Sequence, residues 1–196
     1  MPAQTGQIRT NVKKATKESV EVERYSDDFL IRAALDFSKP EKSQDIRSGF
    51  AFIDSLLKGI SAFSGLGIAL EIPKQTGKDE EIIKNAGFAL GEAMRKLYEK
   101  RKAKETGVYI NSDGKALCMF AIGAKKQPGE ANLQIIGTPG RGFEPDKFFV
   151  FFDGFAQGFE AEINAVVNLG SAGRAKKDQM EFVSKAFAEA LKQVLG

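Results

Sequence analysis

The clearest hydrophobic pattern in the chain is a helical one between residues 78 and 104. Asp79 can cap the start of such a helix, and Glu80 and Glu81 follow in the first turn, where they favour the helix dipole. The pattern therefore predicts one long helix over Lys78–Lys104. Its apolar positions recur every three or four residues, at Ile83, Ala86, Leu90, Ala93, Met94 and Leu97.

Two further segments carry the same helical period. The first is Gln44–Phe63, which Ser43 or Asp45 can cap and which ends at Ser64-Gly65. The second is Lys176–Leu195 near the end of the chain. We therefore expect a helix in each segment. Their apolar stripes are Phe50, Ile53, Leu57 and Ile60 in the first, and Met180, Val183, Phe187, Ala190, Leu191 and Val194 in the second.

A period of two, typical of strands, occurs in six other segments. In Ser19–Tyr25 it places Val20 and Val22 on one side, and Glu21 and Glu23 on the other. An Asn-Ser-Asp-Gly turn signal joins two of the segments into a hairpin. The expected strands are Ser19–Tyr25, Phe29–Phe37, Ile68–Ile72, Val108–Ile110, Lys115–Ile122 and Leu133–Ile136.

Residues 147–168, which include the run FFVFFDGFAQGF, fit two structures. A turn at Asp153-Gly154 would make a hairpin, and the alternation after Phe159 supports an outgoing strand. A helix is the alternative, because Phe148, Phe152, Phe155, Phe159, Ile163 and Val166 also form a helical stripe. Gly154 and Gly158 weigh against the helix, since each costs about 1 kcal/mol in a helix interior. We favour the hairpin, and in either structure we expect the phenylalanines to lie in the core.

These elements predict an α+β fold. We expect residues 18–196 to form a single domain, in which a curved antiparallel sheet of about five to seven strands is packed by the long central helix and the C-terminal helix. Residues 1–17 show no hydrophobic period and no acidic residue, so we expect a basic flexible arm. The tripeptide Gly-Phe-Ala begins at residues 49, 87 and 154, but unequal spacing and unlike flanks argue against an internal repeat.

Composition indicates a cytoplasmic protein. The lone cysteine, Cys118, excludes an intrachain disulfide, which fits a reducing compartment. The N-terminus lacks the apolar stretch of a signal peptide. Gly59–Leu70, the longest uncharged apolar-rich stretch, is too short to span a bilayer, so we expect no membrane partner.

The chain lacks the residues that most often carry catalysis. It contains no histidine, which removes the commonest general base and zinc ligand. The Gly77-Lys78 pair is not a phosphate-binding loop, because Ile72 and Asp79 stand where a glycine and a hydroxyl residue are needed. From these absences we expect no catalytic residue, no cofactor and no metal site, and therefore a protein that is not an enzyme.

Basic residues gather in several clusters, and these favour a nucleic-acid-binding function. If the clusters converge, they form a surface for the phosphate backbone, while exposed phenylalanines stack on bases of single-stranded DNA or RNA. We expect such a protein to act as a homo-oligomer. The candidate phosphate contacts are Arg9, Lys13, Lys14, Lys17, Arg95, Lys100, Arg101, Lys102, Lys104, Lys125, Lys126 and Arg141.

Two other functions remain open from the sequence. The chain could be a structural or assembly subunit of a shell, tube or scaffold, using its N-terminal arm and its phenylalanine-rich strand as interfaces. It could also be a carrier that encloses an apolar ligand in a phenylalanine-lined cavity.

Overall fold

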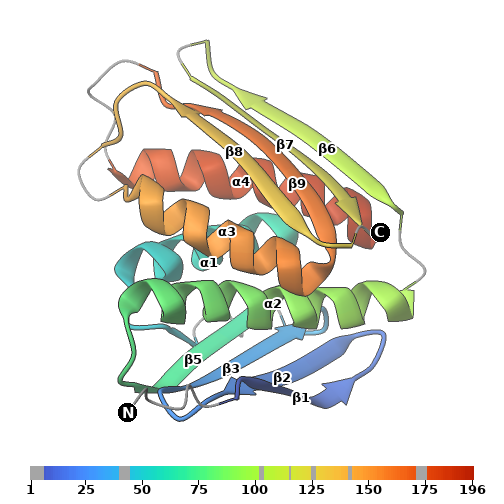
Figure 1. The fold of residues 1–196 in the computed structure, drawn as a ribbon. Coiled ribbons are helices and arrows are strands. Elements are labelled where there is room, and N and C mark those ends of the chain that lie inside the picture. The colour runs from blue at the N-terminus through green and yellow to red at the C-terminus, as the bar shows by residue number, and fades with distance from the viewer. Residues whose placement is uncertain are drawn as a thin grey trace.

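The computed structural model describes residues 7–39, 45–101, 104–114, 116–124, 127–140, 143–170 and 176–196. Within these ranges the chain forms two β-sheets with helices between them (Figure 1). Sheet A contains β1 (Arg9–Ala15), β2 (Ser19–Tyr25), β3 (Phe29–Asp36), β4 (Ile46–Arg47) and β5 (Gly67–Gln75). Sheet B contains β6 (Thr106–Ser112), β7 (Leu117–Ala124), β8 (Glu130–Ile136) and β9 (Ala161–Asn168). The helices are α1 (Ala51–Ser64), α2 (Asp79–Arg101), α3 (Pro145–Phe159) and α4 (Lys176–Leu195).

The helices form two layers between the sheets. Helices α1 and α2 cover sheet A, and α3 and α4 cover sheet B. Across the middle of the molecule, α2 packs along α3 and α1 packs along α4 (Figure 1). The α+β fold expected from the sequence is confirmed, with two sheets in place of the one that was expected. Both sheets are mixed, because β4 pairs with β5 and β8 pairs with β9 in parallel.

The two sheets repeat one topology. Sheet A has the order β1-β2-β3-β5-β4, and sheet B has the order β6-β7-β9-β8. Without β1, each half consists of two antiparallel strands, a third strand, a helix, a fourth strand inserted beside the second, and a final helix. The Gly-Phe-Ala tripeptides do not mark this repeat, since they fall at different places in the two halves.

Segments that bury one face agree well with their sequence pattern. Strand β2 and helix α4 have the expected bounds, and α2 begins at Asp79, one residue later than expected, and is described as far as Arg101. Helix α1 begins at Ala51, later than expected, because Ile46 and Arg47 pair with β5 and Gly49 takes a positive φ of 81°. These residues are therefore extended and do not join the helix.

Part of the expected flexible arm is an ordered strand. Arg9–Ala15 pairs antiparallel with β2 and forms the edge of sheet A. Almost all its side chains are exposed, so neither face of this strand is buried. A strand without a buried face has no reason to alternate apolar and polar residues, which explains why the sequence shows no period there.

The hairpin expected at residues 147–168 is wrong, because the phenylalanine-rich run forms helix α3 and only Ala161–Asn168 is a strand. A Cβ atom on Gly154 would lie 2.0 Å from the carbonyl oxygen of Lys84 on α2. A Cβ on Gly87 of α2 would lie 2.1 Å from the carbonyl oxygen of Phe151 on α3. Gly91 and Gly158 meet the opposite backbone in the same way. The glycines let the two backbones touch, so close packing offsets their low helix propensity.

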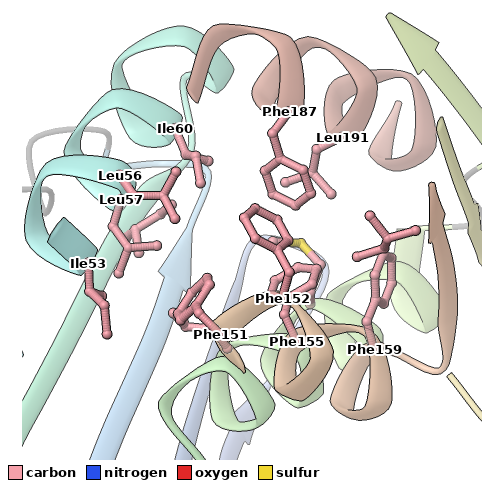
Figure 2. Packing of buried hydrophobic residues seen from close by; sticks show 14 of the residues in the cluster. Ile53, Leu56, Leu57, Ile60, Phe151, Phe152, Phe155, Phe159, Phe187 and Leu191 are labelled. Atoms are coloured by element: carbon pink, nitrogen blue, oxygen red, sulfur yellow. The ribbon is translucent and has the colours of Figure 1, made fainter. Parts of the chain in front are cut away.

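The phenylalanines of α3 fill the space between the helix layers. Phe152 is fully buried, and its ring centroid lies 4.6 Å from that of Phe148 and 5.0 Å from that of Phe187 on α4. Figure 2 shows Phe151, Phe152 and Phe155 pointing from α3 toward α1 and α4. The expectation that this run lies in the core is confirmed for its buried rings, which are not available for stacking on bases, whereas Phe149 is partly exposed.

Candidate functional site

The outer face of sheet A carries a polar pocket, called here the sheet A pocket, with a volume of about 250 Å³. It exists because the residues of β2, β3 and β5 that alternate with the buried ones point away from the helices. Ala34 of β3 and Ala69 of β5 are cross-strand partners and form its floor. Their small side chains leave a hollow between larger neighbours. Charged side chains surround this floor, namely Lys13, Glu21, Glu23, Arg32, Asp45 and Glu71.

Strand register brings the charges together in two rows. Glu23 of β2 lies opposite Arg32 of β3, which in turn lies opposite Glu71 of β5. In the next row, Glu21 lies directly opposite Ala34, so it borders the alanine floor. A bulge in β1 at Lys13 adds a cation from the sheet edge. The pocket is therefore bounded by carboxylates from two non-adjacent strands with a guanidinium between them.

Two cations hold Glu23 in place. The ammonium Nζ of Lys13 lies 2.9 Å from Glu23 Oε2, and Arg32 Nε lies 3.1 Å from Glu23 Oε1. The hydrogen bond from Lys13, helped by Arg32, lowers the pKa of Glu23 below its ordinary value, although partial burial opposes this change. Glu23 is thus a fixed anion that orients both cations toward the pocket.

Glu21 and Glu71 differ from Glu23, because in the described part of the chain neither of them forms an ion pair. Both side chains are partly exposed at the pocket. Carboxylates that are not held by cations leave their oxygens open to contact a bound molecule. The pocket therefore combines two cations for anion binding with two carboxylates for proton transfer.

Removing the Lys13 ammonium should raise the pKa of Glu23 toward that of an ordinary glutamate. A lowered carboxylate pKa stabilises the fold above the pKa of the unfolded chain, and this contribution is lost as the pH falls through the folded value. The wild type should therefore lose more stability than Lys13→Met in that acidic range. An NMR titration of the Glu23 carboxyl in both proteins measures the change. Lys14→Met is the control, since Lys14 lies opposite Glu21, and an unchanged Glu23 pKa in Lys13→Met would contradict the assignment.

Of the basic residues that were singled out in the sequence and that the structure describes, only Lys13 lines this pocket. Arg9 and Lys14 lie on the same exposed edge strand, and Lys17 lies in the turn that follows it. Lys100 and Lys104 are exposed near the end of α2. Lys102, Lys125, Lys126 and Arg141 lie outside the described residues.

The two arginines of α2 are engaged within the chain. Arg95 lies 2.7 Å from Glu92 and 2.8 Å from Glu160, which joins α2 to the end of α3. The guanidinium of Arg101 stacks 3.9 Å from the ring centroid of Phe37 and donates hydrogen bonds to the carbonyl oxygens of Leu195 and Gly196. These contacts give both arginines a structural role.

The sequence interpretation missed most of the sheet A pocket. The alternation of β2 placed Glu21 and Glu23 on one face, and this was the available signal for two of its residues.

Within the described ranges, no group of three or more histidine, cysteine, aspartate or glutamate side chains is placed to hold a metal ion. No helix in these ranges is long and apolar enough to cross a membrane.

No protein-family model matches the chain. A sequence relative is the histidine biosynthesis bifunctional protein HisB of Spirosoma linguale, which is 27% identical over 181 residues. The match covers 89% of this chain and 45% of the relative, so the chain spans less than half the length of the protein it matches.

Two solved structures share the fold. The imidazoleglycerol-phosphate dehydratase (IGPD) of Pyrococcus furiosus superposes with a TM-score of 0.71 at 19% identity, covering 88% of this chain and 92% of that one. The imidazoleglycerol-phosphate dehydratase of Staphylococcus aureus gives a TM-score of 0.61 at 15% identity, covering 84% and 92%. At these identities the likeness establishes a common fold.

These findings overturn the function expected from the sequence. The relatives are a histidine-biosynthesis protein and two dehydratases, so the prediction of a non-catalytic nucleic-acid-binding protein is wrong. The alternatives of an assembly subunit and an apolar-ligand carrier are wrong for the same reason. The physical error lay in treating basic clusters as free for phosphate, whereas Arg95 and Arg101 are used internally.

Proposed function

We propose that the chain is an enzyme, a lyase of the dehydratase type that acts on a small phosphorylated substrate in the sheet A pocket. The observation that carries the proposal is that one pocket holds two cations, Arg32 and Lys13, together with Glu21 and Glu71, which form no ion pair within the described residues. The fold, shared with two imidazoleglycerol-phosphate dehydratases, supports the reaction class. A cytoplasmic homo-oligomer fits this proposal.

The proposed chemistry uses the pocket's own side chains. Arg32 and Lys13 would hold the phosphate through charge-assisted hydrogen bonds, which are stronger than neutral ones. Glu71 would remove a proton from a carbon of the substrate, and the electron pair of that C–H bond would form a C=C bond as the neighbouring C–O bond breaks. Glu21, in its protonated form, would donate its proton to the departing hydroxyl, which leaves as water. Because the chain contains no histidine, the proposal assigns both proton transfers to carboxylates of the pocket.

The test is an assay of the purified chain with imidazoleglycerol phosphate, in which mass spectrometry follows the loss of one water molecule. We expect the wild type to convert the substrate and Glu71→Gln to lower kcat about a hundredfold, the usual contribution of a general base. Arg32→Met should raise KM by weakening phosphate binding.

Glu80→Gln is the matched control, because Glu80 is an exposed carboxylate on the first turn of α2 and does not line the pocket. It should leave the rate unchanged. Absence of turnover in the wild type contradicts the reaction, whereas equal rates in Glu71→Gln and wild type contradict the site.

A further inference from the structure

The outer face of sheet B, called here the sheet B face, exposes a group of large apolar side chains. Ile110 and Val108 of β6 are 55% and 50% exposed, Ile136 of β8 is 43% exposed, and Leu117 of β7 is 37% exposed. Strand register connects them, because Ile110 lies opposite Met119 of β7, which lies opposite Val166 of β9. Exposed apolar side chains gathered in this way mark interaction sites more often than side chains scattered singly.

The polar side chains on the sheet B face are mainly carboxamides. Across the strands, Asn164 lies opposite Asn132, and Asn168 lies opposite Ile136. Within the four described strands, the charged side chains of this face lie at one end, where Glu130 and Glu162 are partners. The alternating outward positions of β6, β7, β8 and β9 include no lysine or arginine. This face therefore differs from that of sheet A, where carboxylates alternate with lysine and arginine.

One position on the β6 edge of sheet B is blocked. Gln193 of α4 accepts a hydrogen bond from the Val108 amide at 3.1 Å and donates one to the Val108 carbonyl oxygen at 2.9 Å. Its carboxamide thus occupies both backbone groups that an added strand would use at that position. A partner strand therefore cannot pair with β6 at Val108, which leaves the face of the sheet as the surface for a partner.

We propose that a second copy of this chain packs on the sheet B face. Carboxamides both donate and accept hydrogen bonds, so a face of amides and apolar groups can be buried against itself without an unpaired charge. A two-fold arrangement that sets the strands of the two copies antiparallel places Glu130 and Glu162 over the opposite end of the partner, away from its own acidic pair. A partner rich in lysine or arginine could form ion pairs with this face only at this one acidic end. The inference assigns a surface to the homo-oligomer proposed above and is independent of the chemistry in the sheet A pocket.

The size of the face sets how tightly two copies should bind. Four strands about 4.8 Å apart and seven residues of about 3.3 Å each give roughly 440 Å². A standard stable interface takes about 800 Å² from each partner. Association through this face alone should therefore be reversible and concentration-dependent.

Sedimentation velocity of the purified chain over a range of concentrations tests the inference. We expect the weight-average mass of the wild type to rise from one chain toward two as the concentration increases. Ile110→Lys places a charge on β6, beside Met119 of β7 and among the exposed apolar side chains of the face. It should raise the dissociation constant at least about tenfold. Ile110 is largely exposed, so this variant is expected to fold, which circular dichroism checks.

Val12→Lys on β1 is the matched control, because Val12 is 36% exposed on the edge of sheet A. It should associate like the wild type. A wild type that stays monomeric at every concentration would contradict the proposal that the chain forms a homo-oligomer. Equal association of Ile110→Lys and wild type, or equal weakening by Val12→Lys, overturns the assignment to the sheet B face.

Discussion

Replacing Gly154 by alanine is expected to lower the free energy of unfolding by about 3 kcal/mol or more, the upper range for overpacking a close-packed interior. The added Cβ would lie 2.0 Å from the carbonyl oxygen of Lys84, a backbone atom that cannot move without moving α2. The effect is opposite in sign to helix propensity, which favours alanine over glycine by about 1 kcal/mol. Urea unfolding at 25 °C measures the difference.

Gly123→Ala is the control for this experiment. Gly123 lies in β7, its added Cβ would come no closer than 4.0 Å to another atom, and its φ is not positive. Alanine at such a position changes stability by only about 0.4–1 kcal/mol, with a stabilising sign where the backbone is compatible. If Gly154→Ala proves as stable as Gly123→Ala, the contact between the backbones of α2 and α3 is not as close as described.

Replacing Phe152 by alanine is expected to cost about 3–5 kcal/mol, the range for truncating a buried phenylalanine. Its ring is fully buried at the centre of an aromatic cluster, 5.6 Å from the centroid of Phe120 and 5.0 Å from that of Phe187 (Figure 2). The cluster joins α3, α4 and β7, so the cavity would lie where three elements meet and could collapse little. Calorimetric or denaturant unfolding measures the loss.

Phe149→Ala provides the comparison, because Phe149 lies three residues earlier on the same helix but is partly exposed. Removing a ring that already contacts water should cost clearly less than removing a buried one. Phe152→Leu should recover most of the stability, since it restores much of the lost volume. Similar losses in Phe149→Ala and Phe152→Ala would show that Phe152 does not hold the core together.

How far the fold could be predicted depends on whether an element buries one face. Strand β2 and helices α2 and α4 do so, and their period gave their type and approximate bounds. Helix α3 was missed because Gly154 and Gly158 stabilise it by allowing close packing against α2, which lies more than fifty residues earlier in the sequence. Their cost is visible in the local sequence, whereas their benefit exists only once the two helices meet.

The candidate site was predictable only in part. The alternation of β2 placed Glu21 and Glu23 together, and Lys13 was singled out for its charge. Arg32 and Glu71 join them through the strand order β2-β3-β5, which inserts a strand that follows helix α1 beside β3. No local pattern encodes that insertion. The absence of histidine excluded mechanisms that depend on imidazole, but it left proton transfer by carboxylates open, and so it did not exclude an enzyme.

The repeated topology gives the molecule two outer sheet surfaces that carry different side chains. Exchanging the two halves maps α2 onto α4 and α3 onto α1, so the α2–α3 contact corresponds to the α4–α1 contact. Two identical polypeptides of half this length, related by a two-fold axis, could form the same layers, but their two outer surfaces would then be identical. Because one chain carries both halves, the two outer surfaces need not be identical: one forms a hollow lined by charged side chains, while the other exposes mainly apolar and carboxamide side chains.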